Sequence, residues 1–134
     1  MKAALVLILF LFAPALAGPA RDDVKRAELN QEFEIKVGEK VLVGRPGVWV
    51  SFEAVTNDSR CPVDVTCVWA GNAKVALKLS RAGRRPARVE LNTGMEPKQK
   101  LYYGYKVRLV KLEPKKNKNL KEGDYVATVV VSRK

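Results

Sequence analysis

The sequence contains no histidine in its 134 residues, and this absence excludes Ser-His-Asp and Cys-His catalytic groups. Beyond residue 17 the chain has one methionine, Met95, and two cysteines, so the usual donors of copper and zinc sites are scarce. There is no glycine-rich phosphate-binding motif and no serine in a nucleophile-elbow context. We therefore expect a protein that is not an enzyme and that needs neither a cofactor nor a metal ion.

Long hydrophobic runs are confined to the start of the chain. Residues 2–17 combine one lysine, an apolar run and the sequence Ala15-Leu16-Ala17, which are the three parts of a secretory signal. No later segment approaches the roughly 20 apolar residues that a transmembrane helix needs. We expect residues 1–17 to be a signal peptide, and the rest of the chain to be secreted or periplasmic without a transmembrane segment.

Acidic residues are scarce in the second half of the chain. Residues 18–73 hold 7 basic and 9 acidic side chains, whereas residues 74–134 hold 17 basic and 5 acidic ones. The most concentrated basic residues are Arg84 and Arg85 in a turn at 81–86, and Lys115, Lys116 and Lys118 in a polar segment at 115–121. Such clusters attract phosphates, sulfated sugars or acidic membrane surfaces, although they can also serve only as solvated loops. Aromatic residues hardly alternate with them, so we expect no nucleic-acid partner.

Helical periodicity with capping residues is absent, and the pattern is almost entirely that of strands. Alternating apolar and polar residues predict strands at 33–37, 41–43, 48–55, 73–80, 87–91, 101–103, 105–112 and 125–131. Seven or eight short strands at this spacing predict an antiparallel β-sandwich or small barrel, immunoglobulin-like in size. We expect residues 32–134 to form this single domain, preceded by a flexible polar arm at 18–31.

The alternation also predicts which side chains are buried. The expected core includes Val50, Phe52, Val75, Leu77, Val107, Leu109, Val126 and Val130. The apolar positions of segment 105–112 change face after Leu109, which predicts a β-bulge or bend. Both tryptophans, Trp49 and Trp69, are expected to pack in the core or at its rim, as lone tryptophans in β domains usually do.

The two cysteines, Cys61 and Cys67, lie in the connection between the strands predicted at 48–55 and 73–80. In an exported chain, a single pair of cysteines is expected to form a disulfide bond. A straight strand would separate these residues by about 20 Å, whereas a disulfide needs Cα atoms about 5.5–6 Å apart. The chain must therefore turn back between them, and Pro62 and Asp64 are suitable turn residues.

The same segment has the pattern D-S-R-C-P-x-x-V-x-C-x-W-x-G-x-A, formed by Asp58, Ser59, Arg60, Cys61, Pro62, Val65, Cys67, Trp69, Gly71 and Ala73. With Val37-Gly38-Glu39 upstream and Tyr105, Val107, Leu109, Leu112 and Pro114 downstream, the chain resembles an uncharacterised family of small exported bacterial β domains. The resemblance covers most of the chain beyond residue 17. It implies a β fold and a location in the cell envelope, and it transfers no catalytic residue.

Two interpretations of the cysteine segment remain open. In the structural one, Asp58 forms an Asx turn, Arg60 pairs with Asp58 or Asp64 or donates to loop carbonyls, and Gly71 supplies a positive φ. A calcium site at the two carboxylates is disfavoured, because Arg60 lies between them in the sequence. In the functional interpretation, the disulfide holds a rigid recognition surface that includes Asp58, Ser59, Arg60 and Trp69.

The leading hypothesis is an exported, monomeric, non-enzymatic binding module that uses this loop and the basic surface. Its partner would be an unknown protein or an anionic component of the envelope. The alternative is a secreted protease inhibitor that presents the Cys61–Cys67 loop in extended form, anchored by Arg60. If residues 101–103 form a separate strand, the segment 115–121 lies beside the cysteine segment. Arg60 and the lysines would then form one composite face for an acidic partner.

Overall fold

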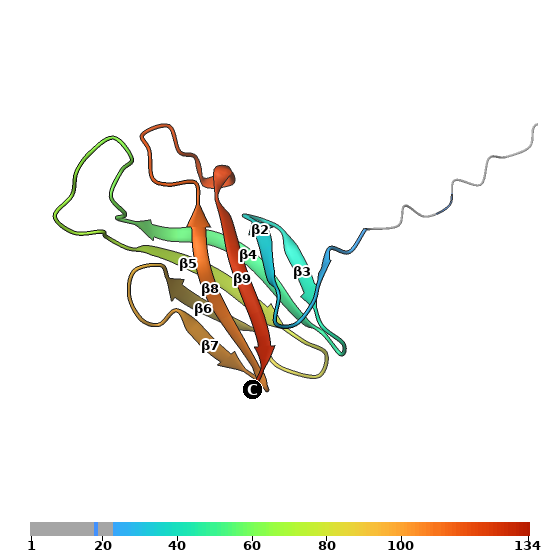
Figure 1. Ribbon diagram of the computed structural model, residues 1–134. Coiled ribbons are helices and arrows are strands. Elements are labelled where there is room, and N and C mark those ends of the chain that lie inside the picture. Colours follow the sequence, from blue (N-terminus) through green and yellow to red (C-terminus); the bar gives the residue numbers. More distant parts are fainter. Residues whose placement is uncertain (1–17, 19–22) are drawn as a thin grey trace, which may run out of the picture.

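The computed structural model describes Gly18 and residues 23–134; the expected signal peptide at 1–17 lies outside the described residues. The described chain forms two β-sheets packed face to face (Figure 1). One sheet has the strand order β1-β3-β4-β5-β6, and the other has the order β2-β9-β8-β7. The elements are β1 (Arg26–Ala27), β2 (Glu32–Lys36), β3 (Lys40–Val43), β4 (Val48–Asp58), β5 (Ala73–Ser80), β6 (Ala87–Asn92), β7 (Gln99–Tyr102), β8 (Tyr105–Glu113), the 3-10 turn η1 (Glu122–Asp124) and β9 (Val126–Arg133). The predicted all-β sandwich is confirmed, and the sheets do not close into a barrel.

The core lies between the two sheets and follows the alternation of the sequence. In β5, Val75, Leu77 and Leu79 are fully buried, while Lys74 and Lys78 lie on the opposite face of the strand. The predicted bulge is also present, as a register shift between Leu109 and Lys111 in the pairing of β8 with β9. Each strand therefore contributes every second side chain to one shared apolar layer.

Six of the eight residues predicted to be nearly buried are so, and the exceptions are Val126 and Val130 in β9, which are only partly buried. The inward face of this strand consists of Ala127, Val129 and Val131 instead, all fully buried. The prediction was wrong because valines occupy both faces of β9, and Val126 and Val130 were assigned to the core although they share a face with Thr128 and Ser132. In such a strand a run of apolar residues does not by itself show which face points inward.

The boundary predicted between a flexible arm and the domain needs correction. From Lys25 onward the segment pairs with the sandwich: β1 lies parallel to β3, and the Gly44 N–H donates to the Ala27 carbonyl at 3.1 Å. The Asn30 N–H then donates to the Val131 carbonyl at 2.8 Å, on the other sheet. A strand of two residues is too short to show alternation, so the pattern gave no sign of it.

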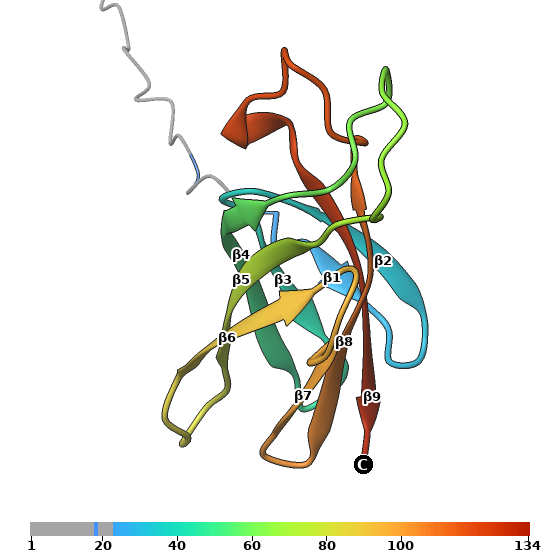
Figure 2. The ribbon, with the colours of Figure 1, turned by 90° about the vertical axis from the view of Figure 1, so that its left-hand side faces the viewer.

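The connections divide between the two ends of the sandwich. We call residues 59–72, between β4 and β5, the cysteine loop, and residues 114–121, between β8 and β9, the lysine loop. Both extend from the same end of the sheets, side by side (Figures 1 and 2). The turns at 81–86 and 103–104 lie at the other end. This arrangement confirms the prediction that the segment around Leu101 forms a separate strand, β7.

Candidate functional site

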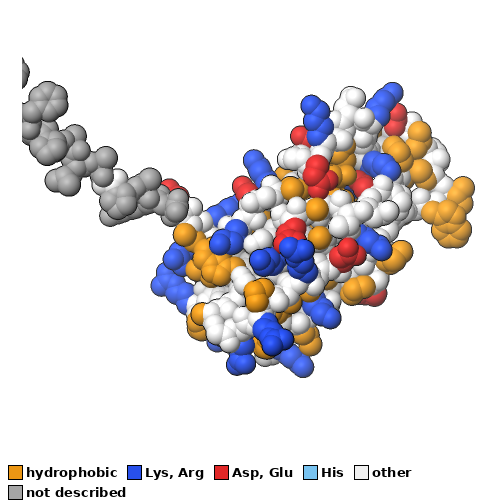
Figure 3. Space-filling model, turned by 180° about the vertical axis from the view of Figure 1, so that it is seen from behind, with side chains coloured by type: hydrophobic (Ala, Val, Ile, Leu, Met, Phe, Trp, Pro, Cys, Tyr) orange, Lys and Arg blue, Asp and Glu red, His pale blue; other side chains and the backbone are white. Residues whose placement is uncertain are grey.

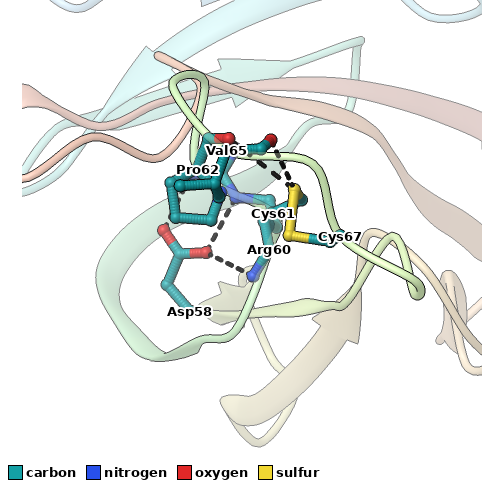
Figure 4. Close-up of a disulfide and its surroundings, with 6 residues drawn as sticks. All are labelled: Asp58, Arg60, Cys61, Pro62, Val65 and Cys67. Carbon is teal, nitrogen blue, oxygen red and sulfur yellow. Dashed lines mark hydrogen bonds and ion pairs between the residues drawn. A yellow bond between two sulfur atoms is a disulfide. The ribbon is translucent and has the colours of Figure 1, made fainter.

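The cysteine loop is closed on itself by the Cys61–Cys67 disulfide, with the two Cα atoms 5.8 Å apart (Figure 4). The chain reverses at the predicted position, where the Val65 N–H donates to the Pro62 carbonyl at 3.4 Å. The ring is also attached to the lysine loop, because the Val63 N–H donates to the Lys116 carbonyl at 3.0 Å. The predicted disulfide and the proximity of the two loops are thus both present.

The base of the loop is held by an ion pair between Asp58 and Arg60, whose side chains are only 9% and 14% exposed. Nε and Nη2 of Arg60 each donate to one carboxylate oxygen of Asp58 at 2.8 Å (Figure 4). The guanidinium also donates to the Leu112 carbonyl at 2.8 Å and to the Pro114 carbonyl at 3.0 Å. Arg60 therefore joins the cysteine loop to the end of β8 and is directed into the molecule.

Two further side chains complete this arrangement. The Tyr125 hydroxyl donates to Oδ2 of Asp58 at 2.9 Å, and the Lys116 ammonium donates to the Asp58 backbone carbonyl at 2.7 Å. We call Asp58, Arg60, Lys116 and Tyr125 the polar latch. It connects residues more than 50 positions apart and fixes the cysteine loop against the lysine loop.

The charges of the latch are stabilised by its own hydrogen bonds. Burial raises the pKa of Asp58, but the hydrogen bonds from Arg60 and Tyr125 outweigh it and leave this pKa below its ordinary value of 3.8. The hydrogen bond to Asp58 raises the pKa of Arg60. Burial and the bond to the Asp58 carboxylate raise the pKa of Tyr125 from 10.0 to about 12. At neutral pH the carboxylate is charged, and the tyrosine keeps the proton that it donates.

Ser59 and Gly71 close the neck of the loop. The Ser59 hydroxyl donates to the Asn72 carbonyl at 2.9 Å and accepts from the Asn72 N–H at 3.2 Å. Gly71 has φ +73°, as predicted, and any Cβ at this position would collide with the Ser59 carbonyl. The buried Asn72 side chain donates to Oδ1 of Asn92 at 2.8 Å. No sequence pattern indicates this asparagine pair, because Asn72 precedes β5 whereas Asn92 ends β6, 20 positions later.

The outer part of the loop has the opposite character. Its large apolar side chains are exposed: Val63 by 60%, Val65 by 53%, Val68 by 91% and Trp69 by 82%. We call these four residues the apolar tip. Hydrophobic side chains gather at this extremity of the molecule in Figure 3. The expectation that Trp69 packs in the core or at its rim is therefore wrong, because this residue follows the closed ring in the outer part of the loop and its side chain lies in water. Trp49 does pack at the rim, where the Lys40 ammonium lies 4.4 Å from its ring centroid.

The expected composite basic face of Arg60 and the lysines does not form at this end. Arg60 and Lys116 belong to the latch, whereas Lys115 and Lys118 are exposed. Residues 58–72 and 113–125 together hold five basic side chains, Arg60, Lys115, Lys116, Lys118 and Lys121, and five acidic ones, Asp58, Asp64, Glu113, Glu122 and Asp124. The surface around the tip is therefore electrically balanced.

The structure separates the other candidates from the loop and places no metal site in it. Arg84 and Arg85 are exposed at the opposite end of the sandwich. Both carboxylate oxygens of Asp58 are occupied by Arg60 and Tyr125. Within residues 23–134 and Gly18, no group of three or more cysteine or acidic side chains is arranged to hold a metal ion.

Comparisons with known proteins give no further guide to the site. No protein-family model matches the chain, and neither a curated protein nor a solved structure is significantly similar to it. The part of the chain that the structure describes contains no helix long and apolar enough to cross a membrane. The geometry of the loops is therefore the basis on which function is inferred.

Proposed function

We propose that this protein is an exported, non-enzymatic binding module whose apolar tip enters a hydrophobic pocket on a partner protein in the cell envelope or outside the cell. The observation that carries the proposal is the exposure of Val68 and Trp69, by 91% and 82%, on a loop fixed by a disulfide and the polar latch. Single exposed apolar residues are ordinary, but four on one short loop form a patch of the kind found at protein interfaces.

Binding through this tip is energetically reasonable. Tryptophan is among the residues that most often dominate the binding energy of a protein interface, because its large ring fills a desolvated pocket. The disulfide and the bond from Val63 to the lysine loop fix the ring at residues 61–67, and the Cys61 N–H donates to the Ala70 carbonyl at 3.1 Å. Val68 and Trp69, which lie between Cys67 and Ala70, are therefore held on both sides before any partner arrives. Little conformational entropy is then lost on binding, which favours a tighter complex.

The chemistry of the tip favours a protein over a lipid surface. Asp64 lies between Val63 and Val65, and insertion into a bilayer would take this carboxylate into the hydrocarbon region at a large cost. Loops and helices that bind membranes usually combine apolar residues with excess positive charge, whereas this end of the molecule is balanced. A protein pocket can accept the apolar side chains and still leave Asp64 in water.

The protease-inhibitor alternative has less support from the geometry. Its anchor, Arg60, donates its hydrogen bonds inside the latch, with the side chain 14% exposed. Residues 63–64 form a turn, whereas a loop that enters a protease cleft presents an extended backbone. We therefore do not include Arg60 in the proposed binding surface.

Quantitative capture from an envelope extract of the source organism tests the proposal. The immobilised parent is compared with Trp69→Ser and with the matched control Leu101→Ser, which removes a 51% exposed side chain from β7. Any protein that the parent retains is then purified, and its affinity for the three chains is measured. We expect Trp69→Ser to weaken binding by at least about tenfold, and the control to leave it nearly unchanged.

Two outcomes would contradict this assignment. Equal affinity of the parent and Trp69→Ser for every retained protein would remove the tip from the interface. Sedimentation of the parent, but not of Trp69→Ser, with vesicles of phosphatidylglycerol would replace the protein partner by a membrane.

A further inference from the structure

The end of the sandwich opposite the cysteine loop is strongly positive. We call it the arginine end; it comprises the turns at 44–47, 81–86 and 103–104, and the last residues of the chain. Its basic side chains are Arg45, Arg81, Arg84, Arg85, Arg133 and Lys134, and the same end holds one acidic residue in the connection from β1 to β2, Glu28. In the described part of the chain, no carboxylate lies within 4.0 Å of any of these six cations. None of the six is therefore paired with a carboxylate, and basic residues outnumber acidic ones at this end, in contrast with the balanced end that carries the apolar tip.

Two of these arginines line a cleft of about 220 Å³, together with Pro46, Tyr103, Gly104 and Tyr105. Nη1 of Arg81 donates to the Tyr103 carbonyl at 2.9 Å, and its guanidinium carbon lies 5.3 Å from the Tyr105 ring centroid. Across the cleft, Nη2 of Arg133 donates to the Arg45 carbonyl at 2.9 Å. Each guanidinium is thus positioned by one backbone bond.

Most hydrogen-bonding capacity of these arginines is unused. A guanidinium has five N–H donors, and within the described residues Arg81 and Arg133 each use one of them. The planar donor set of arginine matches the oxygens of phosphate and sulfate groups, which it binds in a bidentate manner. The cleft is smaller than the pockets that enclose whole drug-sized ligands, so it suits a single charged group on a larger molecule.

The turn beside the cleft has an unusual backbone. Tyr103 and Gly104 have φ values of +40° and +84°, the signs that a type I′ hairpin turn requires and that Asn-Gly adopts most easily. Tyrosine is disfavoured in this conformation, and disfavoured backbone conformations occur most often at functional sites. Tyr103 is 46% exposed, and the Arg84 guanidinium carbon lies 5.1 Å from its ring centroid. An aromatic ring and a third arginine therefore stand at the edge of the cleft.

We propose that the cleft between Arg81 and Arg133 binds a phosphate or sulfate group, with Tyr103 and Arg84 contacting the molecule that carries it. This second site is independent of the apolar tip and lies at the other end of the β-strands. A tetrahedral oxyanion has enough oxygens to accept hydrogen bonds from both guanidinium groups at once. The carrier is either a lipid headgroup or an acidic glycan, and the same arginines would recognise the shared group.

The test compares three probes: inorganic phosphate, a heparin-derived hexasaccharide, and vesicles of phosphatidylglycerol. Affinities are measured at low and at physiological salt for the parent and for Arg81→Gln/Arg133→Gln. The matched control is Lys115→Gln/Lys118→Gln, which removes the same charge from exposed positions at the other end. We expect the arginine variant to bind at least one probe about tenfold or more weakly, the control to change less than about twofold, and added salt to weaken binding.

A second variant distinguishes specific hydrogen bonding to the anion from loss of folding and from non-specific electrostatic attraction. Arg81→Lys/Arg133→Lys keeps both charges but loses the two planar donor sets, so we expect it also to bind more weakly than the parent. Equal binding by this variant and the parent would overturn the proposed site, as would equal weakening by the arginine and lysine pairs of glutamine changes. If the parent binds none of the three probes at low salt, the proposed site is overturned as well. Near-UV circular dichroism, which reports on the packing of the aromatic side chains, and urea denaturation together verify that each variant is folded.

Discussion

The base and the tip of the cysteine loop are a few residues apart and differ in every physical respect. At the base, Asp58 and Arg60 are almost enclosed, and their charged atoms are hydrogen-bonded to side chains and carbonyls from distant parts of the chain. At the tip, Val68 and Trp69 have most of their surface in water. Polar groups are thus buried where the loop joins the sandwich, and apolar groups are exposed where it ends.

Burial of polar groups and exposure of apolar groups reverse the usual arrangement in a folded protein. The difference indicates that the base of the loop serves stability and the tip serves binding. A buried pair with satisfied hydrogen bonds contributes little net stability compared with apolar packing, but the loss of one partner is severe because the other charge remains buried. An exposed apolar side chain contributes little to the folded state and gains its free energy only when a partner covers it. Changes at the base should therefore affect folding, and changes at the tip should affect binding.

The largest expected effect is at the base. Arg60→Ala leaves the Asp58 carboxylate without its main partner and frees the Leu112 and Pro114 carbonyls, so we expect it to lower the free energy of unfolding by about 3–5 kcal/mol. Urea denaturation measures this loss. Arg84→Ala, an exposed arginine at the other end, serves as the control and should change the value by less than about 0.5 kcal/mol. A loss below about 1 kcal/mol for Arg60→Ala would mean that the latch does not hold the loop.

The disulfide lies between the two regions, and its removal should have an intermediate effect. Replacing Cys61 and Cys67 together by alanine releases a short ring, which should lower the free energy of unfolding by about 2 kcal/mol in the chain-entropy model. Hydrogen exchange should become faster at the Val65 amide inside the ring, while the Asn72 amide at the neck stays protected. Equal acceleration at both amides would show that tip and base are one unit.

The dependence of stability on pH above neutrality tests the role of Tyr125 in the polar latch. Its pKa is raised to about 12 in the folded protein from an ordinary 10.0, so its contribution is complete below pH 10 and is lost between pH 10 and 12. Tyr125→Phe should be less stable than the parent at pH 8, and the difference should shrink as the pH approaches 12. Thermal unfolding across this range measures both chains, with Tyr103→Phe as a control outside the latch. A difference that is constant with pH would contradict the hydrogen bond to Asp58.

The smallest effect on stability is expected at the tip. Val68→Ser and Trp69→Ser should each change the free energy of unfolding by no more than about 0.5 kcal/mol, because neither side chain is buried. Chemical denaturation of both variants beside the parent measures this. Destabilisation above about 1 kcal/mol would show that the tip packs against the rest of the molecule in solution.

The fold could be predicted from the sequence because apolar and polar residues alternate along most strands. Leu79, for example, lies between Lys78 and Ser80, which mark the outer face, so strand and burial could be predicted together. Burial was predicted wrongly in β9, where the run of three valines at 129–131 hides the alternation that Thr128 and Ser132 mark on the face of Val130. The prediction also missed β1, which is too short to show a pattern.

The candidate site was only partly predictable for a different reason. Cys61 and Cys67 could be paired because they are the only cysteines. Besides Asp58, the partners of Arg60 are the backbone carbonyls of Leu112 and Pro114. Every residue type has a backbone carbonyl, so no sequence pattern predicts these two hydrogen bonds. The exposure of Trp69 depends on the direction in which the cysteine loop projects, and only the three-dimensional structure gives that direction.

The disulfide ring also has a consequence for the variation that this chain can tolerate. Since Val63, Val65 and Trp69 are largely exposed, the segment that carries them can change composition without redesign of the interior. Asp58, Arg60 and Gly71 are under the opposite constraint, because each is fixed by geometry that few other residues satisfy. The fold can therefore acquire new partners by substitution at a few exposed positions, and a library randomised at residues 63–66 and 68–69 should remain largely folded. In that respect the cysteine loop resembles the variable loops of binding scaffolds, in which a constant framework displays interchangeable surfaces.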